Sequence, residues 1–185
     1  MARQREFDED KVKNALKDIF WQKGYDGTSY SDIMKATGLK KGSLYAAFGD
    51  KQALYQIALN RYDQDDVSAG VTMLRDETLA PLERIAALMN ATVNATKNKQ
   101  GRWGCLLCNA ASEVAPTDSD VEMSVKKSMN RISKAIEFAL APIGKHAFSG
   151  FILASYFGAR TMVKAGYDTE TLMSVRNGVL KTLMS

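Results

Sequence analysis

Cationic, hydroxyl-bearing and very small side chains are concentrated in one short stretch of the sequence: Lys40, Lys41, Gly42, Ser43, Tyr45 and Ala46. Polar side chains such as lysine and tyrosine contact phosphate groups, whereas small and hydroxyl side chains lie against base edges in a DNA groove. Gly42 costs about 1 kcal/mol relative to alanine inside a helix, and a close approach of the backbone to a sugar–phosphate chain would compensate for that cost. Only Leu44 and Phe48 have the character of core residues. This pattern predicts a helix that enters the major groove of double-stranded DNA.

Two cysteines three residues apart, Cys105 and Cys108, form a second group of potentially reactive side chains. A helix start and the nearby Arg102 favour a thiolate, which leaves a thiol-based redox or electrophile sensor as the alternative function. The neighbouring residues are mostly apolar, and apolar surroundings raise the pKa of a thiol and limit its access. We therefore expect that the cysteines are not the main switch. A structural zinc site is not predicted, because the single histidine, His146, is the only further Cys or His ligand.

The rest of the chain has no arrangement of residues typical of catalysis. With no nucleotide loop and no Ser/His/Asp set, the sequence predicts neither an enzyme nor a bound cofactor or metal. It lacks an apolar run of about 18 residues and an N-terminal signal peptide, which predicts a cytoplasmic protein without a membrane partner. The net charge of +4 is spread evenly, because residues 1–51 hold ten Lys or Arg against eight Asp or Glu. The positions of the charges therefore matter more than their sum.

Three helices are expected to position the stretch around Lys41. Apolar residues that recur every three or four positions predict the first helix from about Asp8 to Lys23. Ser29 with Asp32 forms a capping-box pattern for the second helix, which ends before Gly38. The third helix covers about 40–48. Two short helices joined by a tight glycine turn and preceded by a supporting helix are a helix-turn-helix.

The remainder is predicted to be helical as well, since apolar residues keep a helical spacing and only three prolines are present. A long fourth helix begins after Asp50. Further helices are expected at about 82–97, 104–115, 118–140, 149–165 and 169–184. The fold class is therefore all-α with about nine helices: a helix-turn-helix DNA-binding domain, 1–50, and a helical ligand-binding and dimerisation domain, 51–185, joined through the fourth helix.

The segment 24–54 resembles the head of the TetR/AcrR family of bacterial regulators. It matches at seventeen of thirty-one positions in one register, among them Thr37-Gly38-Leu39 and Lys41-Gly42-Ser43-Leu44-Tyr45. The resemblance implies contacts with phosphates from Thr28, Tyr45 and Lys51. It also implies that Lys41, Ser43 and Ala46 face the groove.

Two features of this head modify what the resemblance implies. Lys40 stands where the family often has a serine, so it adds phosphate affinity but weakens the cap of the recognition helix. Arg3 and Arg5 lie on an N-terminal arm that could reach the adjacent backbone or minor groove. Further along, Gly104-Cys105-Leu106 with Glu113 is similar to a subgroup that carries a Gly-Cys pair at this point.

The family resemblance also implies a homodimer built from the last two helices of each subunit, which matches a two-fold DNA operator. Two stripes of apolar and small residues agree with this: Phe151, Ala154, Ser155, Gly158 and Met162 on one helix, and Leu172, Val175, Val179 and Leu183 on the next. The alternative is that both stripes simply close the core of the monomer.

A small-molecule effector that binds inside the body and moves the fourth helix is a further implication of the family. The candidate lining residues are Met89, Val93, Trp103, Cys108, Phe138, Phe157 and Met162. Aromatic and methionine side chains at helical spacing are usually plain core, so this set is an open prediction. The resulting hypothesis is a ligand-responsive regulator, expected to be a repressor, whose effector and operator sequence are not specified by the residues.

Overall fold

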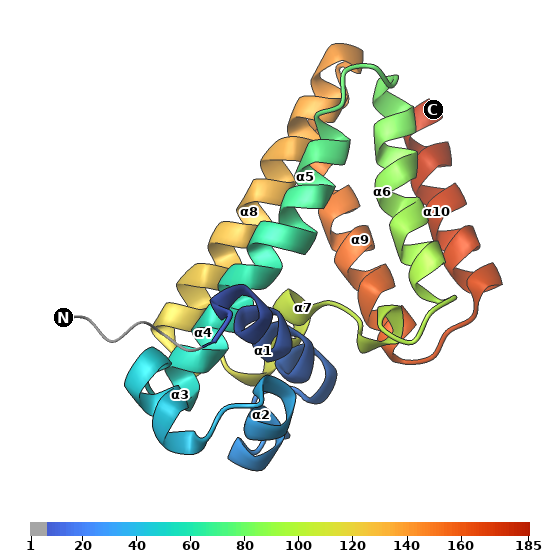
Figure 1. Ribbon diagram of the computed structural model, residues 1–185. Helices are drawn as coiled ribbons and strands as arrows, with labels where there is room; N and C mark the ends of the chain where they lie inside the picture. The colour runs from blue at the N-terminus through green and yellow to red at the C-terminus, as the bar shows by residue number, and fades with distance from the viewer. Residues whose placement is uncertain (1–6) are drawn as a thin grey trace.

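A computed structural model describes residues 7–185, which form an all-helical molecule with a small head and a larger body (Figure 1). The head consists of α1 (Glu9–Lys23), α2 (Tyr30–Thr37) and α3 (Lys41–Phe48). The carboxylate of Asp8 accepts hydrogen bonds from the first amides of α1, and Ser29 with Asp32 closes a complete capping box on α2. Lys40 precedes α3 without any side-chain cap, as the sequence predicted.

A turn at Gly38 sets the angle between α2 and α3. Its φ of 71° lies in the left-handed region, where a side chain would be strained. Ile33 of α2 and Leu44 of α3 are fully buried beneath this turn, while Phe48 is half-buried against the same core. The three head helices therefore pack through a few apolar side chains and leave the rest of α3 free to face outward.

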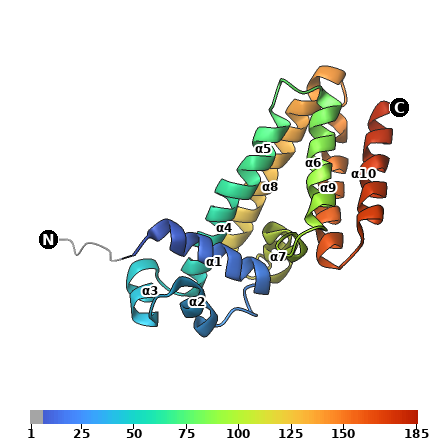
Figure 2. The same cartoon turned by 45° about the vertical axis from the view of Figure 1, so that its right-hand side comes forward.

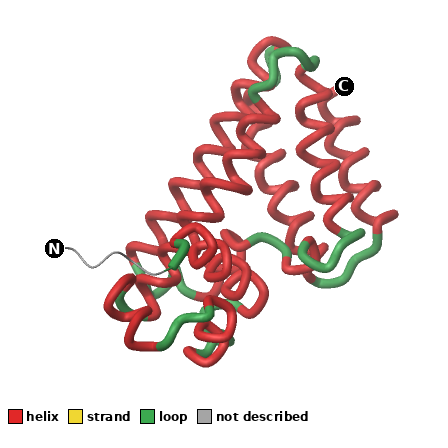
Figure 3. The backbone as a smooth tube through the Cα atoms, viewed as in Figure 1, coloured by secondary structure: helices red, strands yellow, loops and turns green. Residues whose placement is uncertain are grey.

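One long rod connects the head to the body. It begins as α4 (Lys51–Tyr62), passes through a π-helical turn at Asp63–Val67 and continues as α5 (Ser68–Leu74). The long α8 (Ser119–Leu140) runs alongside this rod, and few loops interrupt the helices (Figure 3). The sequence predicted a long fourth helix but not its π turn, a feature that often occurs at functional sites.

The remaining body helices are α6 (Pro81–Ala95), α7 (Leu106–Glu113), α9 (Ser149–Lys164) and α10 (Thr169–Met184). The turned view shows α10 standing beside α6 at the edge of the body, while α7 lies at the junction between body and head (Figure 2). The all-α fold class is confirmed, with nine helices when the continuous rod of α4 and α5 counts as one. Among the described residues, no helix is long and apolar enough to cross a bilayer.

Aromatic side chains pack between the head and the body and hold the two together. The Trp21 ring of α1 stands edge-on to Tyr62 of α4 and to Trp103, with centroid distances of 4.9 and 5.7 Å. Phe20 and Tyr25 both contact the buried ring of Tyr55 in the same way. Such edge-to-face pairs contribute about 0.5–1.5 kcal/mol each beyond the area they bury, so the head and body share a continuous core.

Candidate functional site

The outer face of α3 carries the residues that the sequence assigned to DNA. Lys40, Lys41, Gly42, Ser43, Tyr45 and Ala46 are all exposed. A side chain at Gly42 would meet no atom within 4 Å, so the glycine is not needed for packing inside the protein. The helix thus presents a polar and sterically open face, which suits close contact with an external partner.

Tyr45 does not stand alone on this face. Its ring stacks on that of Tyr30, with centroids 5.5 Å apart and planes 19° from parallel, and the two hydroxyl oxygens are 2.7 Å apart. The ammonium group of Lys41 lies 4.6 Å from the centre of the Tyr30 ring and 5.7 Å from that of Tyr45. Two hydroxyl groups and one positive charge from α2 and α3 are therefore held together. Sequence reasoning missed Tyr30, although its place at the start of α2 was a possible signal.

Lys51 occupies the first turn of α4, where free backbone amides also favour an anion. Its ammonium group lies 4.5 Å above the ring of Tyr25, which holds it near the head surface. Asp50 caps the same helix through the amide of Ala53 at 2.9 Å. This arrangement provides a second positive group close to α3.

Thr28 is placed differently from the prediction. Its side chain is fully buried, and its hydroxyl donates a 2.6 Å hydrogen bond to the carbonyl of Gly24. The hydroxyl closes the loop between α1 and α2 and has no route to a phosphate, so we remove Thr28 from the candidate contacts. Arg3 and Arg5 lie outside the described residues.

A small, partly open cavity lies in the body, and the π turn forms part of its wall. Its walls come from the α4–α5 rod with its π turn and from α7, α8 and α9, and comprise Tyr62, Asp66, Val67, Gly70, Cys105, Leu107, Ile132, Tyr156 and Phe157. The free volume of about 10 Å³ accommodates roughly one water molecule. The lining residues carry hydroxyl, thiol and carboxyl groups as well as hydrocarbon, so walls of this composition suit a ligand of mixed polarity.

Arg160 of α9 lies next to Tyr62, one of the polar residues in the wall of this cavity. Its side chain is buried, donates to the carbonyl of Gly104 and to the Tyr62 hydroxyl at 3.4 Å, and leaves Nε without a hydrogen-bond partner. A hydrogen bond with Cys108, the charge of Arg160 and the Tyr62 hydroxyl lower the pKa of the Cys105 thiol, although burial opposes the shift. The hydrogen bond with Cys105 and burial raise the pKa of Cys108.

The sequence expectation for Cys105 is therefore correct for its access and wrong for its pKa. Cys105 is only 3% exposed, as the apolar surroundings predicted. Its pKa is nevertheless lowered rather than raised, first because of the hydrogen bond with the neighbouring Cys108 and then because Arg160 and Tyr62 reach it from helices that are distant in the sequence.

The seven predicted effector-lining residues do not form one group. Only Phe157 lines the cavity, whereas Met89 and Val93 are buried in α6 and Cys108 contacts the Phe157 carbonyl at 4.0 Å. Trp103 packs on Trp21, and Met162 is half-buried. Phe138 is 36% exposed on α8 under the guanidinium groups of Arg75 and Arg84, which is the surface at the far end of the rod.

Ion pairs and one carboxylate clamp connect the cavity region to the head. Lys17 of α1 bonds Asp65 at 2.8 Å and lies 3.7 Å from Asp66, a wall residue of the cavity. On the other side, Glu113 of α7 accepts from the backbone amides of Tyr25 and Asp26 at 3.0 and 2.7 Å. A displacement of the π turn or of α7 would therefore be transmitted to the head.

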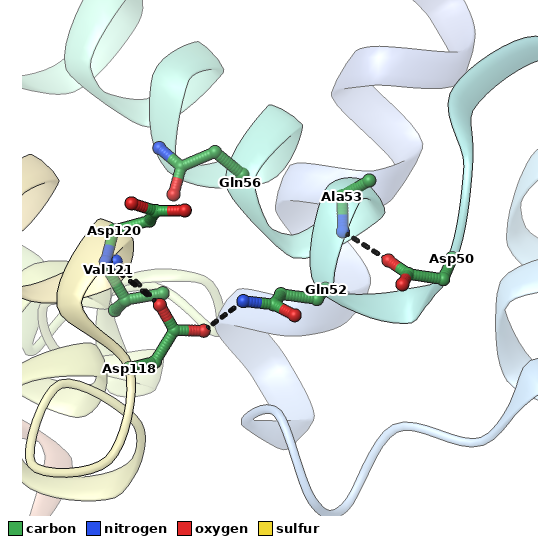
Figure 4. Close-up of a pocket in the computed structure, with 7 residues that line it drawn as sticks. All are labelled: Asp50, Gln52, Ala53, Gln56, Asp118, Asp120 and Val121. Atoms are coloured by element: carbon green, nitrogen blue, oxygen red, sulfur yellow. Dashed lines mark hydrogen bonds between the residues drawn. The ribbon is translucent and has the colours of Figure 1, made fainter.

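A larger open groove of about 310 Å³ separates the start of α4 from the start of α8 (Figure 4). Its acidic side chains already serve the helices: Asp50 caps α4, and Asp118 caps α8 through the amides of Asp120 and Val121. Gln52 donates to the other oxygen of Asp118 at 2.5 Å and ties the two helices together. The groove is thus a structural seam between the first turns of α4 and α8, next to the head.

The two predicted dimer stripes have different surroundings. On α9, Phe151, Ala154 and Gly158 are exposed, and Ser155 and Met162 are half-buried. On α10, the prediction is corrected for Leu172, Val179 and Leu183, which are buried within the monomer, where α10 packs on α6. Val175 is half-buried there, and the exposed apolar side chains of α10 are instead Met173 and Met184.

Comparison with known proteins relates these features to one family. Residues 14–57 match the model of bacterial regulatory proteins of the tetR family. The HTH-type transcriptional repressor ComR of Escherichia coli is 30% identical over 125 residues, which are 68% of this chain and 60% of ComR. This aligned segment spans less than two thirds of ComR.

Solved structures extend the similarity to the whole chain. A cysteine-substituted TetR-family regulator, CifR, complexed with 26-bp double-strand operator DNA has a TM-score of 0.82 at 26% identity, over 97% of this chain and 98% of that chain. The reduced form of NemR from E. coli shares the fold, with a TM-score of 0.81 at 20% identity over 92% and 93% of the two chains.

Proposed function

This chain belongs to the TetR family of bacterial regulatory proteins, and on that premise we propose that it is a transcriptional repressor. In this proposal it binds a palindromic operator in double-stranded DNA as a homodimer and is released by a small-molecule effector. Residues 1–50 form the DNA-binding domain, and 51–185 form the domain for effector and dimerisation. The observation that carries the proposal is the open face of α3, where Lys41, Ser43 and Tyr45 are exposed together.

DNA binding is tested with the DNA upstream of the protein's own gene and with unrelated duplexes. Because Lys51 is proposed to contact a phosphate, Lys51→Ala should weaken binding to all sequences alike and reduce the salt slope by about one. Lys134→Ala, which replaces an exposed lysine in the C-terminal half of α8, is the matched control. A normal salt slope with lost sequence preference would contradict the phosphate role, and absence of binding by the wild type would reject the proposal.

Release by an effector is supported by the position of the cavity. It adjoins the π turn, whose Asp65 and Asp66 face Lys17 of the head. A ligand that expands the cavity would displace these carboxylates and change the separation of the two recognition helices in a dimer. Compounds that dissociate the protein–DNA complex can be found by screening. Phe157→Leu should alter the response to such a compound, whereas Phe138→Leu on the distal surface should not.

A thiol-responsive regulator is the second candidate, and the surroundings of Cys105 favour it specifically. The hydrogen bond with Cys108, the nearby Arg160 guanidinium and the Tyr62 hydroxyl stabilise a thiolate. The test is DNA release by an oxidant, its reversal by a reductant, and the loss of both in Cys105→Ser, Cys108→Ser. Unchanged DNA binding in the presence of oxidant leaves the effector-driven function as the answer.

A further inference from the structure

We propose that Tyr30 is a positioning residue for DNA binding, which acts by orienting the hydroxyl of Tyr45 toward a backbone phosphate beneath the charge of Lys41. The proposal rests on the proposed DNA-binding function and identifies a composite phosphate site shared by α2 and α3. Tyr30 is half-buried against the head core, whereas Tyr45 is 44% exposed. The inner tyrosine is therefore fixed by packing, and the outer one is free to meet a ligand.

The hydrogen bonding of the pair gives each hydroxyl a separate task. A phenol has one proton to donate and can also accept. Tyr30 donates its proton to the Tyr45 oxygen at 2.7 Å, so the proton of Tyr45 remains available to a third group. A hydroxyl that accepts a hydrogen bond becomes a stronger donor, and a phosphate oxygen is an acceptor only. The pair is thus polarised outward, toward the solvent side of α3.

The protonation of Tyr30 is consistent with this order. Burial, followed by the hydrogen bond with Tyr45, raises the pKa of Tyr30 to about 12, while a backbone hydrogen bond from Lys51 acts in the opposite direction. Tyr30 therefore keeps its proton at neutral pH.

Lys41 supplies the charge that two neutral hydroxyl groups lack. Its ammonium group lies over both rings, at 4.6 and 5.7 Å from their centres, and this cation–π contact restrains an otherwise mobile side chain. A phosphate in front of Tyr45 would receive one neutral hydrogen bond and one ionic contact. Removing only the Tyr30 hydroxyl leaves the ring stack and Lys41 in place but frees the Tyr45 hydroxyl to rotate.

The test is a double-mutant cycle that uses a labelled duplex of arbitrary sequence at low salt, because phosphate contacts do not depend on sequence. Tyr45→Phe should weaken binding about tenfold and Tyr30→Phe about threefold, the range of one net hydrogen bond. In the Tyr45→Phe background, Tyr30→Phe should have no further effect. Neither change should alter the salt slope, whereas Lys41→Met should lower it by about one. Tyr167→Phe, an exposed tyrosine of the body, is the matched control.

The outcomes separate this inference from the proposed function. If the wild type binds DNA and Tyr30→Phe binds equally well with an unchanged thermal midpoint, the inference is wrong and the proposed function stands. Additive losses in the double variant would mean that Tyr30 contacts DNA itself, which also overturns the positioning role. A wild type that binds no duplex removes the proposed function and the inference together.

Discussion

The face of α3 and the cavity of the body assemble their polar groups in contrasting ways. The groups proposed to face DNA, Tyr30, Lys41 and Tyr45, lie on two short helices that are adjacent in the sequence, and Lys41 and Tyr45 are exposed. The groups around the cavity, such as Tyr62, Cys105 and Arg160, come from distant helices and are buried. A surface of the first kind can be changed one residue at a time. A cluster of the second kind shares its hydrogen bonds and charges, so one substitution affects all its members.

The same contrast applies to the proposed interface between subunits. Three residues of the α9 stripe, Phe151, Ala154 and Gly158, are exposed and available for a partner, whereas most of the predicted α10 stripe is buried in the monomer core. Gly158→Glu should therefore separate the subunits without unfolding them, because Gly158 is exposed and an added Cβ meets no neighbouring part of the chain within 4 Å. Loss of the second half-site should reduce affinity for a palindromic operator about 100-fold.

Light scattering and anisotropy with the palindromic DNA measure these two effects. Ala69→Glu places the same charge at an exposed position of α5 and serves as the control. An intact dimer in Gly158→Glu would show that the interface avoids this face of α9. The variant Val179→Asp is not suitable here, because Val179 is buried and its replacement would destabilise the monomer itself.

The contrast also explains which features the sequence could predict. The helices follow apolar spacing and local caps such as Asp8, Ser29 and Asp118, so their number and approximate limits are readable from neighbouring residues. The α3 face is readable for the same reason. The π turn was not predicted, and the environment of Cys105 depends in part on Arg160 and Tyr62 from distant helices, which no local pattern reports.

Two single residues show where local reading failed within the head. Thr28 was predicted to contact a phosphate because of its position in the family pattern, but its hydroxyl donates its hydrogen bond to the Gly24 carbonyl. Tyr30 was overlooked because an aromatic side chain at the start of a helix is usually core. Its ring does pack on the core, and only its hydroxyl reaches the surface pair.

A substitution at Arg160 is the strongest test of the buried polar cluster around the cavity. Arg160→Met keeps much of the volume but leaves the Gly104 carbonyl and the Tyr62 hydroxyl without their donor. The free energy of unfolding should fall by about 2 kcal/mol, since these are charge-assisted bonds in a buried site. Urea denaturation measures the change, and Arg102→Met, an exposed arginine, is the control. DNA binding by the folded variant should persist, and equal losses of stability in both variants would contradict the role of Arg160.

A smaller effect is expected at the contact between α7 of the body and the loop that follows α1 in the head. Glu113→Gln retains one acceptor oxygen but removes the charge that holds the amides of Tyr25 and Asp26. The unfolding free energy should decrease by about 1 kcal/mol, and amide exchange should accelerate at residues 24–26 more than in the rest of the head. Glu137→Gln, an exposed glutamate of α8, should change neither quantity. Unaltered exchange at 24–26 would mean that the clamp does not hold the head.

The smallest expected effect concerns the thiol of Cys105, where a lowered pKa coincides with poor access. Absorbance at the thiolate band should reveal a group that titrates below the ordinary thiol value of about 8.5 and disappears in Cys105→Ser. Because the folded pKa is lowered, the thiolate contributes stability that is fully present above the unfolded pKa and is lost as pH falls through the folded pKa. The stability of the wild type relative to Cys105→Ser should therefore rise with pH in the window between the two values.

Labelling of Cys105 in the native protein by a thiol reagent, followed separately from that of the half-buried Cys108, should nevertheless be slow, because Cys105 is 3% exposed and a reagent must wait for the cavity to open. The labelling rate thus reports opening of the body rather than the ionisation of the thiol. A compound that occupies the cavity should slow the labelling further. Rapid labelling at neutral pH, together with oxidant-driven DNA release that is lost in Cys105→Ser, Cys108→Ser, would instead make the buried cluster the sensor. The body would then differ from the head in its chemistry as well as in its burial.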